Sequence, residues 1–355
     1  MSRLFVYFSQ RLLASILLVW LILIAFDAVF ATFGELGDIG RGSYGPAQLF
    51  QVMLLSLPGR AYALFPMAAL IGVLLGTGAL SAHGELLAAR VAGLSRARFV
   101  SWVLILGTLF LLLVMLLGER LAPAADQQAG IVRAQALFNR VAVENDLGIW
   151  VRDGDRYVHI GSVTDNGRLQ DVQVFEFADN HQLRQASQAA AARYDGGGWV
   201  LDDVRESRFP GDRVQVRQSA HTHWQRLVKP EMISVLAREP EYMTLPELHR
   251  YIAYLQENGV GNLRYRLDFW SRLVQPLTVL AMLLLGIGFV LGVAPRSSTG
   301  WRLFTGIFVG LLFKLFNDLF AQAGLVYGLP PVFSALLPTL FVLGAAVWLL
   351  RHERV

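Results

Sequence analysis

The sequence predicts a polytopic membrane protein with six transmembrane α-helices and one folded all-β domain inserted between the third and the fourth helix. Hydrophobic residues make up 54% of the 355 residues and charged residues only 16%, well below the roughly 25% typical of soluble domains. Six apolar stretches reach or approach the length needed to cross a bilayer, and one long polar segment separates them into two sets of three.

The six predicted spans cover residues 12–34, 61–82, 99–118, 273–293, 303–326 and 332–350. The first continues without a signal-peptidase pattern, so we expect an uncleaved helix. Arginines cluster in every second loop, at Arg3 and Arg11, at Arg90, Arg96 and Arg98, at Arg296 and Arg302, and at Arg351 and Arg354. Because basic residues in short loops favour the cytoplasm, we expect both termini inside and the inserted domain outside.

The polar segment 122–267 consists of short alternating stretches, which predict a β domain. Candidate strands at 149–152, 157–160 and 172–177 are separated by turn signals at Asp153-Gly154 and Asn166-Gly167, and later turns fall at Asp195-Gly196 and Pro210-Gly211. This spacing favours a sandwich, a jelly roll or a barrel. The flanks 124–141 and 245–255 have helical periodicity. We therefore predict that residues 1–121 and 268–355 form the membrane helices and that residues 122–267 form the inserted domain.

Several catalytic classes find no support in the sequence. The two lysines, Lys229 and Lys314, precede Pro and Leu, so no phosphate-binding loop of the ATPase type can form. H-E-x-x-H and G-x-S-x-G patterns are missing, and the chain has no cysteine. His221 and His223 lack a nearby third ligand, which favours a polar strand face over a metal site. The Gly-Gly-Gly at 196–198 is better explained as a turn.

The segment 82–96 between the second and third spans has the composition of a short surface helix that ends near Gly93. Two interpretations are open at this point: a simple connector, or an amphipathic helix that docks into a partner's groove. In the second case Leu86, Leu87 and Val91 would be apolar anchors and Glu85 a polar contact.

Ionisable residues inside the spans are costly and therefore suggest function. They are Asp27 in the first span and Lys314 with Asp318 in the fifth. Lys314 and Asp318 could neutralise each other at i,i+4 spacing, or all three could line a polar cavity. A set of arginines is also expected where the inserted domain meets the bilayer: Arg41, Arg60, Arg120, Arg133, Arg140, Arg264, Arg266 and Arg272. Guanidinium groups suit phosphate, so a phosphorylated amphiphile is the sharper hypothesis and lipid headgroup contact the simpler one.

Ordered blocks along nearly the whole chain resemble the LptF/LptG permease family of the lipopolysaccharide-export ABC transporter, and its LptG branch more closely than its LptF branch. They include Arg41-Gly42-Ser43-Tyr44, Phe65-Pro66-Met67-Ala68, Glu85 with Ala92-Gly93, Gly118-Glu119 with Ala122-Pro123, Arg133-Ala134-Gln135-Ala136, Trp150 with Asp153-Gly154, Trp270-Ser271 with Gln275-Pro276, and Leu325-Val326-Tyr327-Gly328 with Pro330-Pro331.

The resemblance implies an inner-membrane half-transporter of a Gram-negative bacterium with a periplasmic β-jellyroll. It implies pairing with an LptF permease and contacts with an LptB ATPase dimer, which would bind ATP and Mg, with LptC, and with a periplasmic LptA bridge. Lipopolysaccharide would leave the outer leaflet through a cavity between the two permeases. No cofactor or metal is expected in this chain itself.

The resemblance also implies roles for single residues. The coupling contact to the ATPase would involve Glu85, Leu86, Leu87, Arg90, Val91 and Gly93. Substrate contacts would involve Arg133 at the lipid phosphate, with Lys314 or Arg41 in place of the lysines that some members carry, and Asp27 in the polar wall of the cavity. Phe26, Leu70, Leu312, Phe316 and Phe320 would line the acyl chains. Some members carry lysines near the end of the first span, where this chain has Ala31, Gly37 and Asp38. Two other classes stay open: a membrane-anchored scaffold without transport activity, and a lipid-modifying enzyme, for which the sequence assembles no acid/base or metal site.

Overall fold

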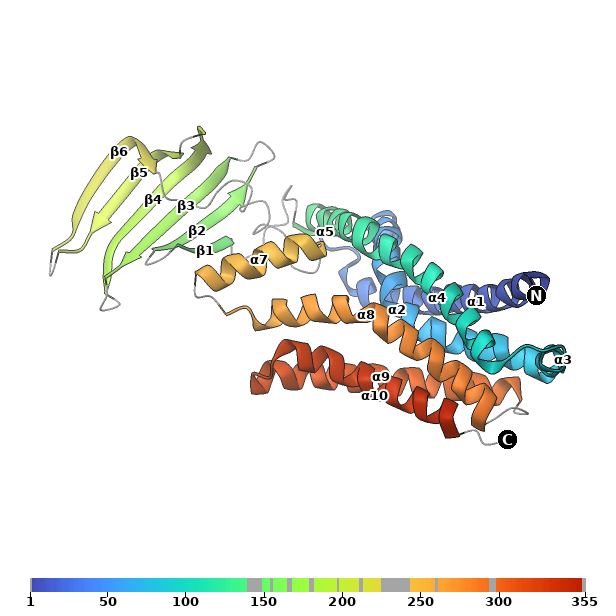
Figure 1. Cartoon of the computed structure of the whole chain (residues 1–355). Coiled ribbons are helices and arrows are strands. Elements are labelled where there is room, and N and C mark those ends of the chain that lie inside the picture. Colours follow the sequence, from blue (N-terminus) through green and yellow to red (C-terminus); the bar gives the residue numbers. More distant parts are fainter. Residues whose placement is uncertain are drawn as a thin grey trace. The chain divides into compact units, whose positions relative to one another are not determined.

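A computed structural model describes residues 2–138, 149–153, 156–164, 168–178, 182–196, 198–210, 213–224, 243–258, 261–293 and 298–352. The chain forms two compact units (Figure 1). One comprises residues 1–37, 53–125 and 263–355 and holds the long helices, and the other comprises 38–52 and 126–262 and holds the sheet. The predicted combination of six long apolar helices with an inserted β domain is confirmed.

Within the described residues, six helices are long and apolar enough to cross a membrane. They are α1 (Ser2–Glu35), α2 (Pro46–Ala82), α4 (Arg96–Leu116), α8 (Leu263–Gly288), α9 (Thr299–Tyr327) and α10 (Pro331–His352). Helix α2 begins 15 residues before its predicted span, because Pro46 is well suited to the first position of a helix although the first turns are more polar. Helix α4 continues through the π-helical turn η2 (Leu117–Leu121) into α5 (Ala122–Phe138).

Pro66 inside α2 leaves a backbone carbonyl without its helical donor, and a neighbouring helix supplies one. Pro66 has no N–H, so the carbonyl of Tyr62, four residues earlier, lacks its helical donor. The side-chain amide of Gln275 on α8 donates to this carbonyl at 3.0 Å. One residue earlier, the indole N–H of Trp20 on α1 donates to the carbonyl of Ala61 at 2.8 Å. Polar side chains thus join three membrane helices at the proline.

The helical core lies around α2 and α8, which are largely buried, whereas α1 and α9 are mostly exposed. Trp20, Phe65 and Phe110 pack edge to face with ring centroids 5.2 to 5.6 Å apart, which joins α1, α2 and α4. On the other side of the core, the buried hydroxyls of Thr278 and Thr339 form a 2.7 Å hydrogen bond between α8 and α10. The exposed faces of α1 and α9 are apolar, with Phe30, Phe33 and Phe308 among their side chains.

The inserted unit contains one antiparallel sheet whose six described strands pair in sequence order. They are β1 (Ile149–Asp153), β2 (Arg156–Val163), β3 (Leu169–Phe177), β4 (Leu183–Tyr194), β5 (Trp199–Arg208) and β6 (Gln215–Trp224). The predicted strands coincide with β1 to β3, and the turn at Asp195-Gly196 is confirmed, with Gly196 at φ +93°. The predicted turn at Asn166-Gly167 lies outside the described residues, as do Gly154 and Gly211 of the turns predicted at Asp153-Gly154 and Pro210-Gly211. A jelly roll needs a second layer, so that detail stays a prediction.

One face of the sheet is apolar over part of its length. Ile160, Val172, Ala189 and Val204 lie opposite one another on β2 to β5 and are almost fully buried. The buried Leu169 and Leu201 lie three residues from the nearest member of this row, because Asp171 and Asp203 adopt positive φ and shift the alternation.

Helix α7 (Leu245–Glu257) follows a capping box in which the backbone N–H and the hydroxyl of Thr244 donate to the Glu247 carboxylate.

Candidate substrate and coupling sites

An arginine clamp forms where the segment between α1 and α2 packs on α5. Asp38 ends the short helix η1 (Leu36–Asp38), and its two carboxylate oxygens accept from different arginines. Nη1 of Arg41 lies 2.9 Å from one oxygen and Nη2 of Arg133 lies 2.6 Å from the other. The Arg133 side chain is 43% exposed and that of Arg41 73%, whereas Asp38 is 17% exposed. We call Asp38, Arg41 and Arg133 the clamp.

The backbone of the same segment holds the clamp against α5. The N–H of Ser43 donates to the carbonyl of Ala136 at 2.7 Å, and its hydroxyl donates to the same oxygen at 3.1 Å. Gly42 has φ +57°, and a Cβ built there would lie only 2.5 Å from the Ala136 oxygen and 2.7 Å from that of Leu137. Glycine is therefore required both for the left-handed conformation and for the close approach to the helix.

Both predicted intramembrane carboxylates form ion pairs. Asp27 on α1 accepts from Arg60 on α2 at 2.7 Å, and both side chains are about one-third exposed. Lys314 donates to Asp318 one turn later on α9 at 2.7 Å, and both are more than half exposed. The first pair joins two helices, whereas the second is local. The Asp27–Arg60 pair could not be derived from spacing along the chain, because the two residues lie 33 positions apart.

The residues expected along acyl chains divide into exposed and buried ones. Phe26 on α1 and Leu312 on α9 are 62% and 54% exposed. Phe316 and Phe320 are half-buried, because Phe316 packs on Phe320 and on Phe341 of α10, at centroid distances of 4.8 and 5.7 Å. Leu70 is 1% exposed and packs in the core of the chain itself. In the isolated chain, Phe26 and Leu312 present most of their surface to a ligand, Phe316 and Phe320 present only part of theirs, and Leu70 presents almost none.

The segment between α2 and α4 contains the helix α3 (Glu85–Val91), shorter than the predicted 82–96. Leu86 is buried in the helical core, whereas Leu87 and Val91 are 67% and 84% exposed. Oε2 of Glu85 is buried and has no hydrogen-bond partner among the described residues. Arg90 lies in the last turn, and Gly93 at φ +92° follows the helix end, which agrees with the predicted cap. Leu86 thus anchors α3 to the chain, and Leu87 and Val91 form its free apolar face.

A buried arginine on α9 was missed by sequence reasoning, which placed it in a loop. Arg302 is 1% exposed, and a Cβ on Gly78 of α2 would lie 2.5 Å from its Cδ and Nη1. Gly306 and Gly310 follow at four-residue spacing, and added Cβ atoms there would lie about 3 Å from side chains of α2. The G-x-x-x-G spacing was a usable signal for this close helix contact. No pattern in the sequence indicates that the guanidinium of Arg302 is buried beside this contact between α9 and α2.

The two histidines of β6 each contact a different carboxylate. Nδ1 of His221 lies 3.0 Å from Asp202, and Nδ1 of His223 lies 3.6 Å from Asp195. Burial opposes ionisation of Asp202, but hydrogen bonds from His221 and Arg168 outweigh it and hold the pKa of this carboxyl below its usual value. In the described part of the chain, no group of three metal-ligating side chains occurs.

Of the arginines expected where the inserted domain meets the bilayer, Arg140 lies outside the described residues.

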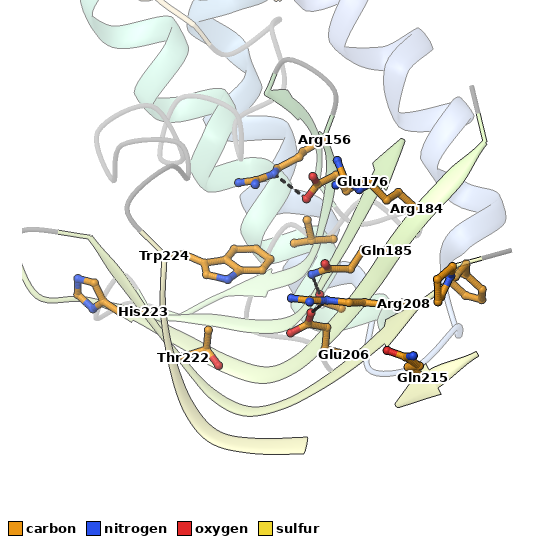
Figure 2. A pocket seen from close by; sticks show the side chains of 14 residues that line it. Arg156, Glu176, Arg184, Gln185, Glu206, Arg208, Gln215, Thr222, His223 and Trp224 are labelled. Atoms are coloured by element: carbon orange, nitrogen blue, oxygen red, sulfur yellow. Dashed lines mark hydrogen bonds and ion pairs between the residues drawn. The ribbon is translucent and has the colours of Figure 1, made fainter. Parts of the chain in front are cut away.

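The sheet also carries a polar cavity on one face (Figure 2). Its volume is about 1060 Å³, and its lining side chains come from β2 to β6 and from the hairpin after β5. Figure 2 shows Arg156 beside Glu176 and Arg208 beside Glu206, with the Trp224 ring facing the same space. Sequence reasoning did not identify this cavity, since its members are spread over 69 positions and meet only through strand pairing.

Comparison with known proteins gives matches that extend over almost the entire chain. The family model described as lipopolysaccharide export system permease LptF/LptG matches residues 6–352. The lipopolysaccharide export system permease protein LptG of Escherichia coli (strain K12) is 31% identical over 350 residues, which cover 98% of this chain and 97% of that protein. The LptG protein of Haemophilus influenzae is 30% identical over 350 residues, or 98% of each chain.

These matches include the membrane helices and the inserted domain alike, so they concern the whole architecture and not one motif. A permease family also agrees with the prediction of a transport protein in place of an enzyme. The chain belongs to the LptF/LptG family of lipopolysaccharide export system permeases.

Proposed function

We propose that this chain is the permease subunit of an ATP-driven transporter that extracts lipopolysaccharide from the outer leaflet of the inner membrane and passes it toward a periplasmic bridge to the outer membrane. The observation that carries the proposal is the match to lipopolysaccharide export permeases over 98% of the chain. In this scheme both termini and α3 lie in the cytoplasm and the sheet lies in the periplasm, as the arginine distribution favours.

A second permease of the LptF type would cover the exposed apolar faces of α1 and α9. In the described chain these two helices are the least buried of the six candidate spans, which fits helices that complete their packing in a heterodimer or in lipid. The cavity between the two permeases would then receive acyl chains against Phe26 and Leu312, which are both exposed. Phe316 and Phe320 would contribute their exposed edges, and Leu70 would support the wall from behind.

The ATPase would act on this chain through α3. The exposed Leu87 and Val91 offer an apolar face, and the buried, unpartnered carboxylate oxygen of Glu85 offers an acceptor for a donor from another protein. The chain has no phosphate-binding loop, so ATP and Mg would be bound by an LptB dimer. LptC and LptA would receive the lipid on the periplasmic side.

The clamp is the proposed contact for a lipid phosphate. Arg133 and Arg41 are both partly exposed and share one carboxylate, so the three side chains carry one net positive charge. A phosphate would replace or join Asp38 as the acceptor of their hydrogen bonds. Asp27 and Lys314, the other charged residues expected at the substrate cavity, are each joined to one partner of opposite charge.

The test is ATP-dependent release of lipopolysaccharide from proteoliposomes that contain this chain with its permease partner and ATPase. Leu87→Asp should reduce co-purification of the ATPase and lipid release by roughly tenfold or more, because it places a charge in an apolar contact. Val216→Asp is the matched control, since Val216 is also exposed but lies on β6. Lipopolysaccharide release that needs no ATP, or equal effects of the two variants, would contradict the proposal.

A further inference from the structure

The cavity on the sheet has a polar row that crosses five strands. Strand pairing places one residue from each of β2 to β6 in line: Arg156, Glu176, Gln185, Arg208 and Gln215. Two positions further along β2 and β3, on the same face, Val158 and Val174 are buried in the apolar core. The same face of the sheet therefore changes from apolar to fully polar within one strand repeat.

The charges in the cavity are mostly paired, with positive charge in excess. Nε of Arg156 lies 3.2 Å from a carboxylate oxygen of Glu176, and Nε of Arg208 lies 2.5 Å from one of Glu206. Arg184 also lines the cavity, and no described carboxylate forms an ion pair with its side chain. Three arginines thus face two glutamates, which favours an anionic ligand.

An aromatic ring lines the same cavity as the polar row. Trp224 ends β6 and packs partly against the apolar core of the sheet, and its ring faces the same space as Gln185 in Figure 2. Thr222, His223 and Ser187 add smaller polar groups to the lining. Val174, Phe209 and Pro210 are the other apolar residues of the lining. The cavity therefore combines the flat indole ring with the planar hydrogen-bonding groups of arginine, glutamate and glutamine.

This chemistry suits a sugar and not an acyl chain. An acyl chain would remove water from two ion pairs and from Arg184 without replacing their hydrogen bonds, which is costly. A sugar ring has an apolar C–H face for the indole and hydroxyl groups that both donate and accept. The 1060 Å³ volume is large enough for more than one ring. We propose that this cavity binds the anionic saccharide part of a glycolipid.

The choice of probe rests on the proposed function: fully deacylated lipopolysaccharide, a phosphorylated oligosaccharide without acyl chains. Isothermal titration of the full-length chain in detergent micelles should show saturable binding. Arg184→Glu should weaken it by roughly tenfold or more, because it reverses the unpaired charge in the cavity. Trp224→Ala should also weaken it, by roughly fivefold or more, through loss of the stacking surface.

Arg205→Glu is the matched control. Arg205 is exposed on β5 between Val204 and Glu206, so its side chain projects from the opposite face of the same sheet with the same charge. Its substitution should change the affinity by less than about twofold, since purely long-range attraction is screened by salt. Absence of saturable binding would overturn the inference, as would equal effects of Arg184→Glu and Arg205→Glu, or displacement of the saccharide by a single-chain fatty acid.

Failure of the inference can be told apart from failure of the proposed function. Saccharide binding is measured without ATP or partners, whereas transport is measured as ATP-dependent release from proteoliposomes. Transport without saccharide binding would overturn only the inference. The opposite result is also possible: the chain binds the saccharide, Arg184→Glu weakens binding and Arg205→Glu does not, but the complex releases no lipopolysaccharide. This result would support the inference and contradict the proposed function.

Discussion

Replacing Gly42 by alanine should detach the segment that carries Asp38 and Arg41 from α5. The added Cβ would lie 2.5 and 2.7 Å from two backbone carbonyl oxygens of α5, and these atoms cannot move without distorting the helix. The segment must therefore withdraw, which breaks the two hydrogen bonds of Ser43 to Ala136. The ion pair between Asp38 and Arg133 depends on the same approach.

The structure provides a matched control for the size of this effect. Gly40 also has positive φ, at +89°, but a Cβ there would meet no atom within 4 Å. Gly40→Ala should cost only the left-handed backbone penalty of about 1–2 kcal/mol. Gly42→Ala should add the loss of two hydrogen bonds, each worth about 1 kcal/mol. The expected difference between the two variants is therefore about 2 kcal/mol.

Thermal unfolding of the two purified variants in the same detergent measures this difference, followed by intrinsic tryptophan fluorescence. Gly42→Ala should have the lower Tm, and limited trypsin digestion should cut after Arg41 faster than in Gly40→Ala, because the segment is no longer held. Equal Tm values and equal cleavage rates would refute the argument, since they would mean that the close approach to α5 contributes nothing.

Three further predictions concern side-chain pairs. Asp38→Asn should strengthen binding of lipopolysaccharide about threefold, because a phosphate then competes with no carboxylate at position 38 for Arg133. Asp203→Asn, on the sheet, is the charge-matched control. Unchanged or weaker binding by Asp38→Asn would contradict this competition. Asp27→Leu should lower stability by about 2 kcal/mol by leaving Arg60 unpaired, and the double variant with Arg60→Leu should regain most of the loss in Tm. Gln275→Leu should destabilise the chain by about 1–2 kcal/mol, and adding Pro66→Ala should restore stability by supplying the missing N–H to Tyr62; a Tm that falls further in this double variant would refute the bonding scheme.

The sequence was sufficient to predict the six spans and the first strands because both depend on local composition. An apolar stretch of about 20 residues crosses a bilayer whatever its neighbours are, and alternation identifies a strand without knowledge of its partner. The beginning of α2 at Pro46 was not predictable from hydropathy, because its first turns contain Gln48 and Gln51. There the helix continues beyond the apolar stretch, and proline at its first position marks the true start.

Contacts between segments that lie far apart in the sequence could not be predicted from local patterns. Asp27 and Lys314 were both identified as unusual charges, but only the three-dimensional arrangement shows that one is paired across two helices and the other within one helix. Arg302 was assigned to a loop because positively charged residues usually flank spans, and its burial depends on the absence of a side chain at Gly78, more than two hundred positions earlier. Such complementarity is a property of packing and leaves no local pattern.

If the chain binds a lipid phosphate as proposed, the distribution of charge pairs favours the clamp over Arg60 and Lys314. Arg60 and Lys314 each have one carboxylate at 2.7 Å, so a phosphate at either position must separate an existing pair. In the clamp, Asp38 accepts from both Arg41 and Arg133, and the Arg41 side chain is 73% exposed. A phosphate arriving there can accept from Arg41 before Asp38 releases Arg133, which avoids an intermediate with an unpaired charge. Arg41→Gln should therefore slow lipopolysaccharide association more than it speeds dissociation, whereas Arg133→Gln should mainly speed dissociation. Surface plasmon resonance of the two variants measures both rates, and the reverse pattern would show that Arg133 is contacted first.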